Sequence, residues 1–235
     1  MLLLFDIDGT LVQRASGEHA QALLQALRNV HGVQADTISA HGSAAGRTDG
    51  EIARLILLDA GVSARRIDER AQAVRDECCR LYAELCPPDL SGKVIEGIPQ
   101  LLRWLAQQPG VRLSLVTGNF EPVARIKLRA AGLGRFFAAG QGGFGSDSED
   151  RAMLPPLARR RAGEAAGLGV SWPRERTIVI GDTPRDIACA RADGARCLAV
   201  TSGPHPAQDL TQADAVAGSS VQLRELLELA LSQPA

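Results

Sequence analysis

Residues 2–10 read LLLFDIDGT, a short apolar run that ends in two carboxylates and a glycine. Such a run is typical of a strand buried on both faces of a parallel sheet, and we expect this strand over residues 2–7. Similar runs recur at residues 111–117 (VRLSLVT), 177–182 (TIVIGD) and 197–202 (CLAVTS), and segments with helical apolar spacing separate them. Because strands alternate with helices, the sequence predicts an α/β fold with a doubly wound parallel sheet.

A helical segment interrupts this pattern after the first strand. The apolar spacing predicts three helices there: one over residues 20–30 before Gly32, one from Thr48 to about Ala60, and one from Ile67 to Leu85, before two prolines. Thr48 and Glu51 are expected to form a capping box at the start of the second helix. We therefore predict an α/β core of residues 1–12 and 91–235 and an inserted, all-helical domain of residues 13–90.

Composition and charge narrow the classes of partner. The chain has 235 residues, of which 45% are hydrophobic and 23% charged, and its net charge is −1. These values are typical of a soluble globular protein. The 26 basic residues are interspersed among 27 acidic ones, which argues against a nucleic-acid partner because such binding needs clustered Lys and Arg. A small acidic or neutral molecule is the expected partner, and the oligomeric state is left open.

Targeting and cysteine signals are weak. The apolar start MLLLF is short and follows no basic region, so we expect no signal peptide, and no run approaches the roughly 20 apolar residues of a membrane span. We therefore expect a cytoplasmic protein without a membrane partner. The five cysteines form no CxxC pair and are expected to be reduced, buried thiols. Surface or loop positions are expected for the four histidines, His19, His31, His41 and His205.

The two carboxylates of the first strand, Asp6 and Asp8, are the strongest chemical signal. Side chains alternate along a strand, so these two share one side unless the chain bends at the strand end, where Gly9 permits a sharp turn. Two carboxylates on one side repel each other, which is hard to justify without a cation. The alternative, a turn with one Asp as a helix N-cap, explains only one of the two carboxylates.

A second acidic motif ends the strand expected at residues 177–182. Asp182 closes that strand, and Asp186 lies four residues on, in the first turn of a predicted helix that faces the same edge. Carboxylate oxygens of this kind suit Mg²⁺. For this motif alone, the alternative remains open that Asp182 is an N-cap and that Asp186 interacts with the helix dipole.

Two glycine-containing motifs differ in their prospects as phosphate sites. Residues 117–119 (TGN) end the second strand, where a hydroxyl and free backbone N–H groups before a helix form a natural site for phosphate oxygens. The stretch at residues 140–145 (GQGGFG) matches GxGxxG, but it leads into Asp147, Glu149 and Asp150 instead of a helix. These acids would repel a pyrophosphate, so we expect a flexible loop there.

The sequence resembles the haloacid dehalogenase superfamily, which has four motifs in a fixed order. Three of them correspond to residues 6–10, 117–119 and 181–186, and the remaining one is a basic residue between the last two ranges. The helical insertion resembles the C1-type cap of its phosphoglycolate phosphatase-like branch. The resemblance implies a Rossmann-like core. It also implies a Mg²⁺-dependent phosphatase that hydrolyses a small phosphorylated metabolite through an aspartyl-phosphate intermediate.

The same resemblance implies roles for individual residues. Asp6 would be the nucleophile, and Asp8 would be the general acid and base. Asp182 would be the chief metal ligand, with Asp186 in support. The implied phosphate-binding residues are Thr117, Gly118 and Asn119, and the implied metal ligands are Asp6, Asp8 through its backbone carbonyl, Asp182 and Asp186.

The third motif departs from the family pattern. The family places a lysine there, but this chain has only Lys93 and Lys127, and the expected region at residues 146–151 offers Arg151. Arginine stays charged and can bind a phosphate with two hydrogen bonds, so we predict that Arg151 is the catalytic cation. Lys127, on the helix expected after the second motif, is the competing candidate.

Specificity and competing activities depend on the insertion. Arg47 and Thr48 are the residues that we expect to reach from it into the cleft and bind substrate. A sugar phosphomutase shares every core motif and is the main alternative, and a catalytically weak phosphate-binding protein is a second. By the same resemblance, a dehalogenase needs neither Asp8 nor a metal, and a phosphonate hydrolase uses a lysine that the insertion lacks.

Overall fold

The computed structural model describes residues 1–13, 15, 17–34 and 44–232, which contain one sheet with the strand order β3-β2-β1-β4-β5-β6. The strands are β1 (Leu2–Phe5), β2 (Arg112–Thr117), β3 (Gly143–Phe144), β4 (Thr177–Gly181), β5 (Arg196–Val200) and β6 (Ala215–Ala217). Each neighbouring pair is parallel. β1 lies inside the sheet, between β2 and β4. The predicted doubly wound α/β fold is therefore confirmed.

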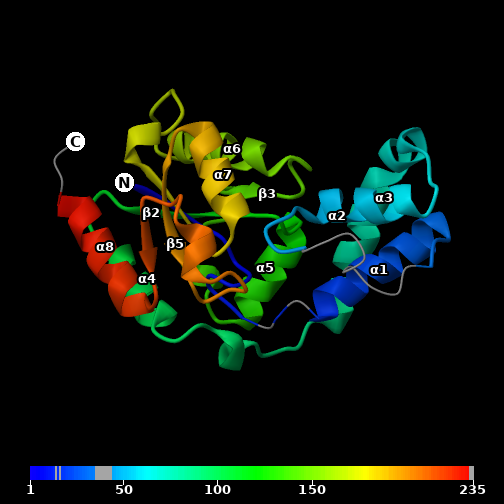
Figure 1. Cartoon of the computed structure of the whole chain (residues 1–235), viewed down its shortest axis with the longest axis horizontal. Coiled ribbons are helices and arrows are strands. Elements are labelled where there is room, and N and C mark those ends of the chain that lie inside the picture. Colours follow the sequence, from blue (N-terminus) through cyan, green and yellow to red (C-terminus); the bar gives the residue numbers. More distant parts are fainter. Residues whose placement is uncertain (14, 16, 35–43, 233–235) are drawn as a thin grey trace.

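Helices cover both faces of this sheet (Figure 1). One face carries α4 (Ile98–Ala106), α5 (Glu121–Ala130) and α8 (Ser220–Ser232), and the other carries α6 (Leu154–Ala165) and α7 (Pro184–Asp193). Side chains alternate along β1, so Leu3 and Phe5 belong to the first apolar layer and Leu2 and Leu4 to the second. Short 3₁₀ turns lie at Ser91–Lys93, Gly134–Phe136, Arg151–Met153, Arg174–Arg176 and Ala207–Leu210.

A separate group of helices lies between β1 and α4 in the chain, on the right of Figure 1. Its members are α1 (Gly17–His31), α2 (Asp49–Asp59) and α3 (Ala64–Leu85). They bury an apolar cluster in which Leu27 of α1, Ile56 of α2 and Tyr82 of α3 take part, and which Val123 of α5 joins from the core. We refer to α1, α2 and α3, with the described residues that lead into them, as the helical insertion.

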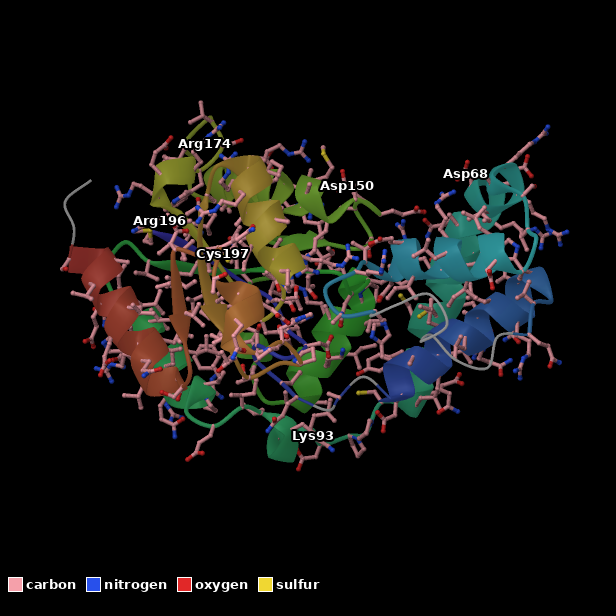
Figure 2. The ribbon with its side chains drawn as sticks, viewed as in Figure 1. Asp68, Lys93, Asp150, Arg174, Arg196 and Cys197 are labelled. Carbon is pink, nitrogen blue, oxygen red and sulfur yellow. The ribbon has the colours of Figure 1, made fainter. Side chains whose placement is uncertain are left out.

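The chain leaves and re-enters the core at one place. The N–H of Gln13 donates to the carbonyl oxygen of Lys93 at 2.8 Å, and the N–H of Ile95 donates to that of Leu11 at 3.1 Å. Lys93 marks this connection at the lower edge of the molecule in Figure 2. Paired connections of this kind are what an inserted domain requires, and the bounds 13–90 stay a prediction.

Two local predictions about loops and caps need correction. The stretch at residues 140–145 is not simply a loop, because Gly143 and Phe144 pair with β2 as strand β3. Thr48 caps α2 as predicted and accepts a hydrogen bond from the N–H of Glu51 at 3.1 Å. The Glu51 carboxylate pairs with Arg47 instead of closing the capping box.

The histidine prediction also fails at two positions. His19 and His31 are buried in α1, because each lies on the face that packs inside the insertion. His205 is partly exposed, and His41 lies outside the described residues. All five cysteines are free thiols; Cys78, Cys189 and Cys197 are buried as predicted, but Cys79 and Cys86 are only half-buried. Among the described residues, no helix combines the length and the apolarity needed to cross a membrane.

Candidate active site

The first acidic motif lies where β1 ends and the chain turns back. Asp6 directly follows β1, and its N–H donates to the carbonyl oxygen of Ile180 on β4 at 2.9 Å. After Asp8 the backbone passes through Gly9 at a φ of 88°. A Cβ atom on Gly9 would lie 2.2 Å from Oδ2 of Asp182. Glycine therefore permits both the turn and the close approach of the second acidic motif.

Three buried carboxylates meet at this edge of the sheet. Asp6, Asp182 and Asp186 each offer an oxygen within 4.8 Å of the other two. Burial raises the pKa of Asp6 to about 7 and that of Asp182 to about 8, and repulsion between neighbouring carboxylates adds to both shifts. Asp182 Oδ1 accepts a hydrogen bond from the Thr10 hydroxyl at 2.9 Å, whereas Oδ2 has no partner among the described residues. Such an oxygen is costly to bury, and a divalent cation would satisfy it.

Asp186 is engaged more fully than Asp182. Thr183 is the N-cap of α7 in a capping box: its hydroxyl accepts from the N–H of Asp186 at 3.3 Å, and its N–H donates to Asp186 Oδ2 at 3.0 Å. The Thr183 hydroxyl also lies 2.7 Å from Oδ2, to which it can donate. Arg151 Nη2 donates to Asp186 Oδ1. The alternative in which Asp182 caps this helix is therefore wrong. Because Asp182 keeps an unpartnered oxygen among the described residues, it is the more available metal ligand of the two.

Arg151 lies between two of the carboxylates. It opens the 3₁₀ turn before α6, which Asp150 caps by accepting a hydrogen bond from the N–H of Ala152 at 2.9 Å. Its buried Nη2 lies 3.1 Å from Asp6 Oδ1 and also donates to Asp186. Burial lowers the pKa of Arg151, but the two carboxylates outweigh that effect and raise it well above its usual value. A fixed positive charge thus faces Asp6, as the role predicted for Arg151 requires.

Lys127 lies against Asp8 instead. From α5 its ammonium donates to Oδ1 and Oδ2 of Asp8 at 2.8 and 2.7 Å, and to Asn119 Oδ1 at 2.9 Å. Burial raises the pKa of Asp8, but the charges of Lys127 and His19 and the hydrogen bonds from Lys127 and Asn119 outweigh it. The pKa of Asp8 therefore lies below its ordinary value. The two candidate cations of the sequence contact different carboxylates.

A cavity of about 600 Å³ lies over these groups, between the core and the helical insertion. The core contributes Asp6, Asp8, Gly118, Asn119, Arg151 and Asp182 to its walls, and the insertion contributes His19, Leu23, Arg47, Asp49 and Ile52. The predicted catalytic carboxylates thus face a space large enough for a small metabolite.

Two predicted substrate-binding residues, Thr117 and Thr48, are absent from the described lining of this cavity. Thr117 is fully buried, and its hydroxyl accepts a hydrogen bond from the N–H of Asn119 at 3.4 Å. Thr48 is also fully buried, and its hydroxyl donates to the carbonyl oxygen of Glu149 at 2.7 Å while it caps α2. The Thr48 hydroxyl is therefore committed to the fold, which corrects its assignment to the substrate. Its neighbour Arg47 does line the cavity.

Two cavity residues, His19 and Asp49, had not been predicted as site residues. His19 Nε2 lies 3.0 Å from Asp49 Oδ2, which also accepts a hydrogen bond from the N–H of Phe120 at 2.7 Å. The His19 ring packs edge-on against Tyr82 at 5.4 Å between centroids. His19 and Asp49 are 30 positions apart on different helices, so no short motif could have announced their pairing.

The helical insertion contacts the core closely at Gly118. A Cβ atom there would lie 2.0 Å from the carbonyl oxygen of Arg47. The N–H of Asp49 donates to the carbonyl oxygen of Gly118 at 2.8 Å. The glycine of the second motif therefore allows the insertion backbone to form one wall of the cavity.

Comparisons with known proteins match most of the chain. A family model described as haloacid dehalogenase-like hydrolase matches residues 3–191. A phosphoglycolate phosphatase from Mesorhizobium japonicum is 28% identical over 211 residues, which cover 86% of this chain and 83% of that protein. The solved structure of a hydrolase from Pseudomonas syringae is 21% identical, covers 97% of both chains and has a TM-score of 0.64. For CbbY from Rhodobacter sphaeroides in complex with phosphate, the TM-score is 0.60 at 22% identity, over 94% of this chain and 95% of that one.

Proposed function

Because the chain belongs to the haloacid dehalogenase-like hydrolases and is a phosphatase, we propose that it hydrolyses a small phosphorylated metabolite with Mg²⁺, through an aspartyl-phosphate on Asp6. The observation that carries the proposal is the buried group formed by Asp6, Asp182 and Asp186. One oxygen of Asp182 has no partner among the described residues, and the guanidinium of Arg151 lies beside Asp6. This arrangement suits a cation and a phosphate together.

The metal would be held by Asp6 and Asp182, with support from Asp186 and from the backbone carbonyl of Asp8. Hard oxygen donors of this kind are the ligands that Mg²⁺ prefers. Bound Mg²⁺ supplies positive charge that offsets the repulsion between these carboxylates and a phosphate dianion. The raised pKa values of Asp6 and Asp182 fit this assignment, because a bound cation would favour the ionised form of both carboxylates.

In the first step, a carboxylate oxygen of Asp6 forms a bond to phosphorus while the bond from phosphorus to the leaving oxygen breaks. Arg151 beside Asp6 offsets the charge of the incoming phosphate. Protonated Asp8 gives its proton to the leaving oxygen. Because Lys127 favours ionised Asp8 in the free protein, Asp8 must gain this proton as the phosphate dianion binds and raises its pKa.

In the second step, water hydrolyses the aspartyl-phosphate. Asp8, now ionised, takes a proton from the water as its oxygen attacks phosphorus and the bond from Asp6 to phosphorus breaks. The ionised form that Lys127 favours is the form this step needs. Inorganic phosphate and the free carboxylate of Asp6 are the products.

The wall formed by the insertion suggests the class of leaving group. Arg47 and His19 line it beside the apolar side chains of Leu23 and Ile52. Arg47 already pairs with Glu51, and His19 with Asp49, but a guanidinium has five N–H donors, so a short leaving group with a carboxylate would suit Arg47 as a second acceptor. Curated relatives are named phosphoglycolate phosphatases, so 2-phosphoglycolate is the first substrate to test.

Release of inorganic phosphate from 2-phosphoglycolate and from p-nitrophenyl phosphate tests the proposal. We expect release in Mg²⁺, none in EDTA, and a loss of about 10³-fold or more in Asp6→Asn, which removes the nucleophile without changing its shape. Circular dichroism should show that Asp6→Asn is folded. Release that persists in EDTA, or activity of Asp6→Asn above a tenth of the wild type, would contradict the mechanism.

A further inference from the structure

Lys127 carries a buried positive charge. In neither of the two proposed steps does it contact the reacting atoms. Its relative exposure is 0%. A buried ammonium is costly unless it is paired and hydrogen-bonded. Its three N–H donors here meet three acceptors, the two carboxylate oxygens of Asp8 and Oδ1 of Asn119. Because it is enclosed in this way, Lys127 stays out of contact with a substrate in the cavity.

Asn119 ties this pair together. Its Oδ1 accepts a hydrogen bond from Lys127, and its Nδ2 donates to Asp8 Oδ2 at 3.0 Å. The three side chains thus form a closed triangle of hydrogen bonds. The Asp8 side chain nevertheless keeps 25% of its surface exposed and lines the cavity. Asp8 is anchored by the protein while it remains open to substrate.

The chain builds this anchor from one segment. Asn119 ends the second motif, and Lys127 follows eight residues later, about two turns along α5. Asn119 lies just before α5 (Glu121–Ala130) and Lys127 lies within it, so one short segment of the chain brings both groups to the turn that carries Asp8. Arg151 comes from a different segment, before α6, and contacts Asp6.

From this arrangement we propose that Lys127 is a positioning residue, which fixes the Asp8 carboxylate toward the leaving oxygen of the substrate. The inference rests on the proposed role of Asp8 as general acid and base, and it adds a task for Lys127 that is distinct from that of Arg151. Proton transfer needs heavy atoms within about 2.6–3.2 Å, and an unanchored Asp side chain would occupy several rotamers. Holding one rotamer before substrate binds increases the fraction of complexes that can transfer the proton.

Lys127→Met tests the proposal, because methionine keeps a long unbranched chain and removes the ammonium. Phenyl phosphate and p-nitrophenyl phosphate are matched substrates, and phenyl phosphate, with the poorer leaving group, depends more on a proton donor. We expect kcat/KM, which reports the first step, to fall about 10²-fold for phenyl phosphate and less than about 10-fold for p-nitrophenyl phosphate. Equal losses of kcat/KM on both substrates, or no loss on phenyl phosphate, would overturn the proposal.

A double-mutant cycle shows whether Lys127 acts through Asp8. In the Asp8→Asn background, Lys127→Met should change the rate with phenyl phosphate by less than about twofold, because no carboxylate remains to be positioned. A loss as large as that in the wild-type background would mean that Lys127 acts elsewhere, and the proposal would fail.

Thermal unfolding of each variant shows whether a loss of activity comes from misfolding or from a misplaced Asp8 carboxylate. If Lys127→Met does not fold, Lys127→Arg keeps the buried charge but replaces a point donor with a planar fork, so the same dependence on leaving group is expected. A ratio of the two substrate rates equal to that of the wild type would overturn the proposal. A wild type without Mg²⁺-dependent phosphate release would contradict the proposed function itself, whereas an active wild type with fully active Lys127 variants would contradict this inference alone.

Discussion

The core and the helical insertion line one cavity with different kinds of residues. On the core side, buried charges follow the ends of strands, as Asp6 follows β1 and Asp182 follows β4. On the insertion side, Leu23 and Ile52 stand beside a few polar groups carried by helices. The carboxyl ends of parallel strands meet at one edge of a sheet, whereas a helix face gains its direction from packing. The core side is therefore suited to phosphoryl transfer, and the insertion side is suited to specificity for the leaving group.

After Asp6→Asn, the largest effect expected on the core side is that of substituting Arg151. In Arg151→Ala, Asp6 and a bound phosphate would face each other without this charge, so we expect the rate to fall about 10²-fold or more on every phosphate ester. Arg151→Lys should recover part of the loss, because lysine restores the charge without the planar fork. Steady-state kinetics with phenyl phosphate and p-nitrophenyl phosphate would check this. If Arg151→Ala loses little activity, and if the loss depends on the leaving group, the roles given to Arg151 and Lys127 would have to be exchanged.

Asp182→Ala tests the metal site on the same side. Since few protein carboxylates would hold the proposed ion, losing one should raise the Mg²⁺ concentration for half-maximal activity by about 10-fold or more. Asp209→Ala is a matched control, because Asp209 is an exposed acid that pairs with His205. Unchanged Mg²⁺ titrations for both variants would place the metal elsewhere.

On the insertion side, Arg47→Met should change specificity more than chemistry. We expect the KM for 2-phosphoglycolate to rise about 10-fold, as for the loss of one charged hydrogen bond, while kcat for p-nitrophenyl phosphate stays near the wild-type value. Arg65→Met provides the control, because Arg65 is an exposed residue of the insertion that pairs with Glu69. Equal losses of kcat on both substrates would show that the insertion takes part in the chemistry and would weaken the contrast between the two sides.

The smallest expected effect is that the stabilisation of the folded protein by Mg²⁺ depends on pH. The pKa values of Asp6 and Asp182 are raised to about 7 and about 8 in the folded protein, so the metal-free fold binds more protons than the unfolded chain between about pH 4 and 8. The contribution of these groups to stability is therefore lost as the pH rises through that range. Mg²⁺ replaces the protons, and we expect it to raise Tm by a few degrees more at pH 8 than at pH 6.

Thermal unfolding with and without Mg²⁺ at the two pH values measures this difference directly. Asp182→Asn is the control, because it removes one of the two titrating ligands and should reduce the difference. A larger stabilisation at pH 6 than at pH 8 would mean that the ion does not bind through these carboxylates.

The contrast between the two sides also explains what the sequence could predict. Strands β1, β2, β4 and β5 lie where apolar runs were found, and Asp6 and Asp182 meet because both follow central strands. The short strands β3 (Gly143–Phe144) and β6 (Ala215–Ala217) were missed, since two or three residues cannot show a strand pattern.

The remaining site residues depend on helix directions that no local pattern specifies. His19 and Asp49 meet across α1 and α2, and Lys127 reaches Asp8 across 119 positions of the chain. The sequence identified Lys127 as a candidate cation, but only the position of α5 shows which carboxylate it contacts. Thr48 was predicted as both a helix cap and a substrate residue, and its single hydroxyl serves the cap and Glu149.

A crystal structure with Mg²⁺ and fluoroberyllate, which mimics an aspartyl-phosphate, tests the central claim most directly. We predict beryllium bonded to a carboxylate oxygen of Asp6, Mg²⁺ at about 2.0–2.1 Å from an oxygen of Asp182, and the guanidinium of Arg151 beside the fluorine atoms. Fluoroberyllate bonded to any other residue, or Mg²⁺ bound without Asp182, would contradict the account.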